Sequence, residues 1–509
     1  MTSPGAADPA RADPLEPRGY AGRIPLGGRT LRQHAARGTL VNGGFQVGVV
    51  TLNLLKGLVV AAFLSVSDFG LWGILTVTVM SFAWLKQVGV GDKFVQQSEP
   101  DQRVAFQRAF TLELCFAVGF VALCAALLPL ISIAYGDSRI VAPGILLAVA
   151  LALSAFQAPL WILYRRMQFT RYRALQSVDP VASFIVTVSL AAAGGGYWSL
   201  VVGALAGAVA GSVVAVATSP YPLALQLDRP TTREYVGFSA PLVVASLASL
   251  VIAQGSIFAA EAHLGLAAAG AIALAVTIAH YSDRVDEIVT ASLYPAICAV
   301  TDQRDLLREV FVKSNRLALI WAVPFGVGIA LFAAPLVHHV LGDKWAPAIV
   351  LLQVFGLTAG LGHIGFNWTA FYRAIGDTRP IAIWSVAAMI TFLAVAVPLL
   401  LTHGLAGFAG GIAAMTVTSL VVRGVYLARL FGSATVVLHT VRAIAPSVPA
   451  VALVLGLRLV AGGDGAARAL VELALYLVVT AVATAILERS LLAEALAYLR
   501  RPREVGPAA

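Results

Sequence analysis

The chain has 509 residues, of which 59% are hydrophobic and only 12% are charged, with a net charge of +9. Apolar runs of about 20 residues recur along it, and each is long enough to cross a hydrocarbon core of roughly 30 Å as a helix. Such runs exclude a soluble domain, and they are too long and unbroken for barrel strands of about 10 residues. We therefore predict an all-α, polytopic membrane protein. Because the positive charge follows the loops between the runs, we expect membrane lipids as partners and no nucleic acid.

The pattern predicts fourteen transmembrane spans between two tails. Residues 1–37 are rich in Pro, Gly, Ala and Arg and contain no apolar run, which predicts a disordered cytoplasmic tail rather than a signal peptide. The predicted spans are 38–64, 70–91, 106–134, 140–164, 174–194, 197–218, 236–260, 266–290, 313–341, 347–373, 380–402, 405–430, 440–461 and 466–488. Residues 490–509 form a second predicted cytoplasmic tail.

The basic residues indicate the orientation of these spans. Most of the 35 Lys and Arg residues fall in loops on the side of the two tails, and only Arg139, Lys344 and Arg468 fall in loops on the other side. Lysine and arginine favour the cytoplasmic side. We therefore expect both termini in the cytoplasm. The Ala/Arg/Gly-rich composition and the absence of organelle signals fit a bacterial inner membrane.

Short motifs recur in the same order with an offset of 201 to 208 residues. The matched positions are Asp101–Arg103 with Asp302–Arg304, Gly136 with Gly342, Tyr164 with Tyr372, and Gly203 with Gly407. Spans 1–6 therefore resemble spans 7–12, and because six is even the two units share one orientation. We predict an N-lobe (38–235), a C-lobe (236–432) and two additional helices (433–489).

Span 6 carries a stripe of small residues at Gly203, Gly207 and Gly211. Glycine at every fourth position allows close helix approach in lipid. A tight contact within the lobe is the favoured interpretation, and a dimer interface is the alternative.

Several segments resemble a known family. They are Tyr164-Arg165-Arg166-Met167-Gln168-Phe169, Gly194 to Val201, Ser67 to Gly70, Gln87 to Gly91, Leu293 to Ala296, and Leu341 to Trp345. In this order they are similar to the polysaccharide-transport flippases, the oligosaccharide branch of the multidrug/oligosaccharidyl-lipid/polysaccharide exporter superfamily. The resemblance implies two six-helix lobes that rock around a central cavity, and a lipid-linked oligosaccharide as cargo. Where relatives often carry an Asp in span 7, this chain has Ser256 near Gln254.

Span 1 contains a polar stripe formed by Asn42, Gln46, Asn53 and Lys56. Their spacing places them on one helical face, which should line a cavity or the bundle interior. Lys56 is its only charge, and a buried charge is costly in a membrane. We predict that Lys56 contacts an anionic headgroup, with snorkelling as the alternative.

The remaining candidates are polar groups in or beside other spans. Those predicted to line the cavity are Gln254, His363 and Asn367, and those predicted to lie at an inner gate or inner face are Glu113, Arg165, Arg166 and Arg284. His363 and Asn367 are four residues apart in span 10 and should share a helical face. The predicted span 8 ends with His280, Asp283 and Asp286. We interpret them either as a proton relay or as a cluster at the membrane boundary.

No enzyme motif is present in the sequence. It has no Walker A pattern, and we expect no cofactor. We expect no metal site at His338 and His339, because no third ligand follows at helical spacing. The favoured function is an alternating-access flippase for a polyprenyl-pyrophosphate-linked oligosaccharide, with polysaccharide polymerase or assembly proteins as further candidate partners. The alternatives are an ion-coupled drug antiporter, a membrane glycosyltransferase and a non-transporting scaffold.

Overall fold

The structure is a computed structural model, and it describes residues 31–494 with short gaps. The gaps are scattered positions within 66–88, residue 136, residues 433–440 and 443, residues 461–464, and residue 492. The predicted tails at 1–37 and 490–509 therefore lie largely outside the described residues, and predicted spans 2 and 13 are described only in part.

Every regular element among the described residues is helical. The α-helices are α1 (Leu31–Phe63), α3 (Val90–Gln96), α4 (Gln102–Tyr135), α5 (Val141–Leu153), α6 (Pro159–Arg165), α7 (Phe169–Gln176), α8 (Val178–Ala192), α9 (Trp198–Ala217), α10 (Arg229–Leu264), α11 (Leu266–Ala279), α12 (Arg284–Ala299), α13 (Arg304–Leu336), α14 (Ile349–Gly362), α15 (Trp368–Ile375), α16 (Arg379–Thr391), α17 (Val397–Phe431), α19 (Ser447–Val460) and α20 (Ala466–Leu487). Short 3₁₀ or π segments join several of them: η3 (Ser138–Ile140), η4 (Ser154–Gln157), η5 (His280–Asp283), η6 (Val337–Leu341), η7 (Asp343–Ala348) and η8 (Phe392–Ala396).

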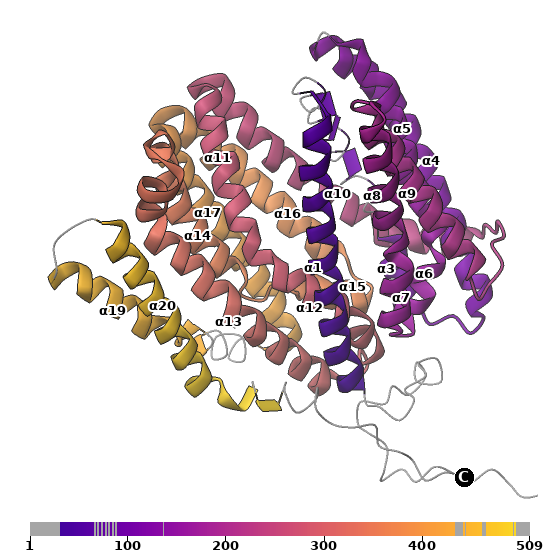
Figure 1. The fold of residues 1–509 in the computed structure, drawn as a ribbon. Coiled ribbons are helices and arrows are strands. Elements are labelled where there is room, and N and C mark those ends of the chain that lie inside the picture. The colour runs from indigo at the N-terminus through magenta and orange to yellow at the C-terminus, as the bar shows by residue number, and fades with distance from the viewer. Residues whose placement is uncertain are drawn as a thin grey trace, which may run out of the picture.

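The helices form two lobes (Figure 1). Helices α3 to α9 lie on one side and α10 to α17 on the other, while α1 lies between them and packs against both α8 and α12. Helices α19 and α20 lie outside the second lobe and pack against α13. Ten described helical segments are long and apolar enough to cross a membrane. The all-α, two-lobe membrane fold is thus confirmed, whereas the count of fourteen spans stays a prediction.

The glycine stripe of span 6 packs inside the N-lobe. A Cβ atom at Gly203 would lie 1.9 Å from Thr187 Oγ1, and one at Gly207 would lie 2.7 Å from the backbone oxygen of Asp179, both on α8. The repeat-related glycines behave alike, because a Cβ at Gly411 would lie 2.3 Å from the Cα of Ala396 in its own lobe. The stripe therefore forms intra-lobe contacts, as the favoured interpretation predicted.

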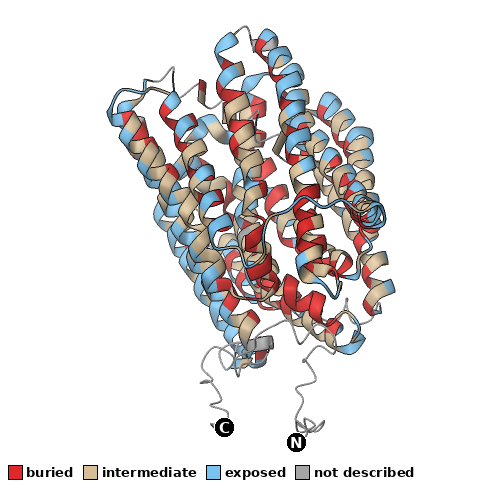
Figure 2. Ribbon diagram, turned by 90° about the vertical axis from the view of Figure 1, so that its right-hand side faces the viewer, coloured by how far each residue is buried: buried red, intermediate tan, exposed pale blue. Residues whose placement is uncertain are grey.

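The largest buried apolar cluster joins the two lobes. It contains Val95 and Phe169 from the N-lobe side and Tyr294, Phe311 and Phe371 from the C-lobe side. Figure 2 shows many buried residues towards the end of the molecule at which the first turns of α1 and the end of α20 also lie. We call this end the terminal side, and it is where the lobes contact each other.

Several of the predicted spans are interrupted within their length, and three of these breaks bear on the site. Span 4 is divided into α5 and α6 by η4, span 8 into α11 and α12 by η5, and span 10 into α14 and α15 by a turn with Gly365 at φ 69°. Span 8 also continues through Ala299, beyond its predicted end at residue 290. In an unbroken helix the backbone N–H and C=O groups bond to each other. Each interruption frees some of these groups, which other parts of the protein must then satisfy.

The glycine contact makes a stability prediction. Gly207→Leu should lower the thermal unfolding midpoint of the detergent-solubilised protein by several degrees, because overpacking costs about 1–3 kcal/mol. The control is Gly119→Leu on α4, where nothing lies within 4 Å of the added Cβ. Equal midpoints for the two variants would contradict the α8–α9 packing.

Candidate functional site

Helix α3 connects the two lobes at the terminal side. The Asp92 carboxylate accepts a hydrogen bond from Arg373 Nη1 at 2.5 Å, and its backbone oxygen accepts one from the Tyr294 hydroxyl at 3.0 Å. From the N-lobe, Arg165 donates to the backbone oxygens of Phe94 and, at 2.6 Å, Gln97. Arg165 and Arg373 follow the repeat-related Tyr164 and Tyr372, so equivalent arginines of the two lobes bind the same short helix.

The motif after α6 contributes to this closure. Met167 has φ 54°, and its backbone turn lets the chain reverse into α7. Phe169 then packs against α1 so closely that a Cβ at Gly38 would lie 2.6 Å from its ring. In the family-like motif from Tyr164 to Phe169, Met167 and Phe169 therefore have structural roles.

A second link between the lobes runs through Asn42 on α1, which is 2% exposed. Its amide nitrogen donates to Ser292 Oγ of α12 at 2.7 Å, and its amide oxygen accepts from Arg173 Nε of α7 at 2.6 Å. One side chain thus bridges both lobes, and it also orients the Arg173 guanidinium.

Above this closure lies a cavity of about 830 Å³ between the lobes. Its walls come from α3, α4, α6 and α7 of the N-lobe and from α10, α12, α15, α16 and α17 of the C-lobe. We call it the central cavity. Its size falls in the range of small-molecule sites, which bind ligands with many apolar and a few oriented polar groups.

The central cavity carries uncompensated positive charge. Three arginines line it, Arg173, Arg373 and Arg423, and only Arg373 has a carboxylate within ion-pair distance among the described residues. The acid Glu113 also lines the cavity, but it lies 3.9 Å from Lys86. Arg173 and Arg423 each donate hydrogen bonds to neutral groups of the protein, so their charge still attracts an anion in a region of low dielectric constant.

Aromatic rings form much of the remaining wall. They are Trp161, Tyr164, Tyr172, Phe366, Trp368 and Trp384. The guanidinium of Arg423 lies 5.6 Å from the Trp384 ring centre. The buried Trp384 Nε1 and Arg423 Nε atoms form no hydrogen bond. Two donors beside aromatic faces suit a ligand that combines acceptor oxygens with sugar rings, whose C–H faces pack on aromatic surfaces.

The predicted polar stripe of span 1 is divided among different environments. Asn42 joins the lobes, Gln46 is half-buried, and Asn53 is exposed. Lys56 points towards α8, where its Nζ lies 3.4 Å from Ser183 Oγ, and it is not among the residues that line the central cavity. Its assignment to an anionic headgroup stays a prediction that no contact in the cavity supports.

The other predicted residues also occupy separate places. Glu113 lines the central cavity, Arg165 binds α3, and Arg166 Nη2 donates to the Tyr221 hydroxyl at 3.1 Å. Gln254 is exposed on α10. The side chain of Arg284 lies outside the described residues.

Span 10 does not present His363 and Asn367 on one helical face. The helix ends at Gly362 and restarts at Trp368, so the four-residue spacing no longer predicts a common direction. His363 instead lies beside Asp283 and Asp286, and Asn367 Nδ2 donates to Ser314 Oγ at 2.8 Å.

Sequence reasoning missed Asp92, Arg373, Arg423 and the tryptophans of the cavity. The repeat contained a usable signal for Arg373, since Tyr372-Arg373 repeats Tyr164-Arg165. Arg423 lies in span 12, where it resembled an ordinary cytoplasmic boundary residue.

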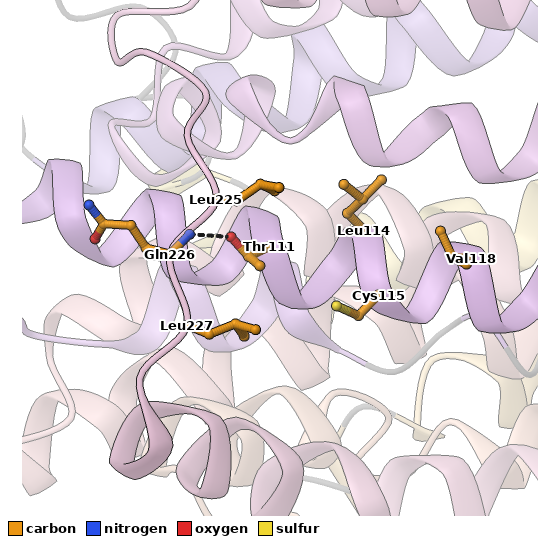
Figure 3. Close-up of a pocket in the computed structure, with 7 residues that line it drawn as sticks. All are labelled: Thr111, Leu114, Cys115, Val118, Leu225, Gln226 and Leu227. Carbon is orange, nitrogen blue, oxygen red and sulfur yellow. Dashed lines mark hydrogen bonds between the residues drawn. The ribbon is translucent and has the colours of Figure 1, made fainter.

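A smaller apolar groove of about 490 Å³ lies on the N-lobe surface (Figure 3). It is formed by α4 and the extended segment that joins α9 to α10, whose Gln226 backbone N–H donates to Thr111 Oγ1 at 2.9 Å. Leu225 and Leu227 point towards α4, whereas the Gln226 side chain points away. The segment ends at Asp228, the N-cap of α10, where hydrogen bonds from Thr231 lower the pKa of the carboxyl. This groove holds no charged residue, so it is a less suitable site for a polar cargo.

Comparison with known proteins agrees with this geometry. The sequence profile of a family described as "Polysaccharide biosynthesis protein" matches residues 59–350, more than half of the chain. The chain belongs to this family. Two relatives of the chain agree with this assignment to the family. The succinoglycan biosynthesis transport protein ExoT of Rhizobium meliloti is 21% identical over 348 residues, 68% of this chain and 69% of the relative. The lipopolysaccharide biosynthesis protein WzxC of Escherichia coli is 24% identical over 353 residues, 66% of this chain and 69% of the relative.

Solved structures with the same fold are also known. A MATE transporter in its straight conformation superposes with a TM-score of 0.63 at 13% identity, over 79% of this chain and 97% of the transporter. A transporter of the MOP superfamily from Pyrococcus furiosus gives a TM-score of 0.63 at 13% identity, over 84% and 97% of the two chains. The chain thus shares the fold of these two solved structures.

The contact between Asp92 and Arg373 makes a second prediction. Asp92→Arg and Arg373→Asp should each lower the thermal midpoint of the purified protein, since losing a charged hydrogen bond costs about 1–3 kcal/mol. The double swap should recover part of the loss, because opposite charges again face each other. Arg139→Asp, which removes the exposed partner of Asp137, is the control and should have little effect. A double variant less stable than both single variants would contradict an α3–α15 ion pair.

Proposed function

We propose that the protein is an alternating-access flippase that moves a polyprenyl-pyrophosphate-linked oligosaccharide from the inner to the outer leaflet. The observation that carries this proposal is the central cavity. Two of its arginines have no carboxylate within ion-pair distance among the described residues, and six aromatic rings form part of the same wall. The guanidinium groups match a pyrophosphate, which accepts paired hydrogen bonds. The aromatic walls match sugar rings, and the names of ExoT and WzxC place these relatives in polysaccharide transport and biosynthesis.

A flippase needs a polar path through the hydrocarbon core. Each unsatisfied polar group of a sugar costs several kcal/mol in lipid, so the saccharide must be enclosed while the prenyl chain stays among the lipid tails. Closure at the terminal side depends on the shared apolar cluster and on a few polar contacts, chiefly Asp92 with Arg373 and Asn42 with Ser292. Breaking these contacts would let the lobes rock and expose the cavity to the opposite side.

Orientation and partners belong to the same proposal. The basic loops favour cytoplasmic termini in a bacterial inner membrane. The terminal side, where α3 closes the cavity, then faces the cytoplasm, and the described state opens outwards. Polysaccharide polymerase or assembly proteins would receive the cargo on the outer side.

The competing function is an ion-coupled antiporter for small drugs, which the shared two-lobe fold permits. A cationic drug favours a cavity with excess negative charge. The central cavity has the opposite excess, because both of its carboxylates, Asp92 and Glu113, are paired with cations. The charge therefore favours an anionic cargo.

A gene deletion tests the flippase function. In a deletion strain of the source organism, surface polysaccharide and membrane-bound lipid-linked oligosaccharide are measured together. We expect lost surface polysaccharide and accumulated complete lipid-linked units, because synthesis continues while translocation stops. Loss without accumulation would indicate a biosynthetic enzyme instead, and unchanged amounts of both would contradict the proposal.

Arg173 provides a residue-level prediction in the same strain. Complementation with Arg173→Gln should reduce export at least tenfold, because the cation that holds the pyrophosphate is lost, whereas Arg173→Lys should retain part of the activity. The matched control is Arg171→Gln, two residues away on α7, which is exposed and lies outside the cavity. Equal export by the Arg173→Gln and Arg171→Gln proteins at equal expression would exclude Arg173 as a cargo contact.

A further inference from the structure

Two interrupted helices of the C-lobe bring three ionisable side chains together beside Arg423, which also lines the central cavity. Asp283 ends η5 and Asp286 lies in the first turn of α12, while His363 follows the last residue of α14. Helices α11 and α14 pack against each other and have 14 residues each, about 21 Å of helix. The two breaks therefore lie at the same level of the lobe, where the side chain of Asp283 is 44% exposed, that of Asp286 18% and that of His363 5%.

The donor atoms of the three side chains converge. His363 Nε2 lies 2.8 Å from Asp286 Oδ2 and 3.4 Å from Asp283 Oδ1, and one donor atom from each residue lies within 4.8 Å of the others. Four ligands around a zinc ion at 2.0–2.2 Å are separated by about 3.3 Å in tetrahedral geometry. The two histidine–carboxylate separations, 2.8 and 3.4 Å, lie near this value.

The histidine is oriented towards a cation. Its side chain is 5% exposed, and its Nδ1 lies 2.6 Å from the backbone oxygen of Ala359, so Nδ1 carries the proton. Nε2 forms no hydrogen bond with either carboxylate despite the short distances, and Asp286 Oδ1 is buried without a partner. Nε2 therefore faces two carboxylate oxygens at 2.8 and 3.4 Å, an arrangement that either a proton on Nε2 or a shared metal cation stabilises, and a metal would take the place of that proton.

Surrounding groups hold these side chains in place. His280 Nδ1 lies 2.7 Å from the other oxygen of Asp283, and Asn315 Nδ2 donates to the backbone oxygen of His363 at 3.0 Å. Arg423 donates to the backbone oxygen of Ile364 at 2.7 Å and interacts electrostatically with Asp286. A histidine that donates its second N–H to a carbonyl, and a carboxylate that is itself hydrogen-bonded, are the usual outer contacts of metal ligands.

We propose that Asp283, Asp286 and His363 form a binding site for one divalent transition metal of the zinc class, with a water molecule as the fourth ligand. One nitrogen and two carboxylate oxygens suit zinc, whereas calcium prefers six to eight oxygens and magnesium an octahedral set. A dication neutralises the two carboxylates, which lowers the cost of burying them. The bound metal ties α12 to the break in span 10 and stabilises the C-lobe in this arrangement. This site does not depend on the identity of the cargo.

The test is zinc binding by the full-length protein in detergent, measured by calorimetry after chelator treatment. We expect one Zn²⁺ per chain, at least a hundredfold weaker binding in His363→Gln and Asp286→Asn, and a loss of about 10- to 100-fold in His280→Gln. The matched control is the double variant His338→Gln with His339→Gln, whose histidines lie outside the cluster and whose binding should be unchanged. Absence of zinc binding by the unmodified protein, or unchanged binding in His363→Gln, would overturn the proposal and leave a buried ion pair.

A second variant keeps the test decisive if His363→Gln does not fold. His363→Cys preserves a metal ligand at this position, so the protein should bind Co²⁺ and show a thiolate-to-cobalt charge-transfer band. The unmodified protein should lack this band, because its own cysteines, Cys115, Cys124 and Cys298, lie outside the cluster. A folded His363→Cys protein without the band would also overturn the proposal.

Discussion

The hydrocarbon core of a membrane holds no water that could hydrogen-bond to the backbone. Wherever a membrane helix is interrupted, the protein itself must therefore supply partners for the freed N–H and C=O groups. The break in span 10 shows the consequence. Arg423 donates to the backbone oxygens of Gly362 and Ile364, and Asn315 donates to that of His363. A buried cation is therefore required inside the C-lobe for structural reasons. The same guanidinium lines the central cavity and interacts electrostatically with Asp286 of the proposed metal site. The arginine that the helix break requires therefore contributes its positive charge to both places.

The two lobes use their equivalent arginines in one place. Arg165 binds the backbone at the end of α3, and Arg373 binds the Asp92 side chain on the same helix. This arrangement concentrates the contact between the lobes at the terminal side, together with the shared apolar cluster. Because the contact is confined to this one end, it is compatible with a hinge, whereas the glycine-packed pairs within each lobe are suited to moving as rigid units.

The sequence sufficed to predict the membrane class, most helices, the repeat and the intra-lobe role of Gly203 and Gly207. It failed where contacts join distant segments. Asp283 and His363 are 80 residues apart, and only the coincidence of two helix breaks brings them together. Periodicity assumes continuous helices, so it placed His363 and Asn367 on one face and gave no signal for the break. Lys56 was selected because it is charged and deep, but depth alone does not tell a cavity wall from the α8 interface.

The most direct test of the account is translocation by the purified protein in liposomes. A fluorescent saccharide linked to polyprenyl pyrophosphate is placed in the inner leaflet, and its arrival outside is followed with a membrane-impermeant quencher. The account predicts that protein-containing liposomes expose the saccharide much faster than protein-free liposomes. Equal rates in the two preparations, with the protein folded and correctly inserted, would contradict the assignment of the central cavity to a lipid-linked oligosaccharide.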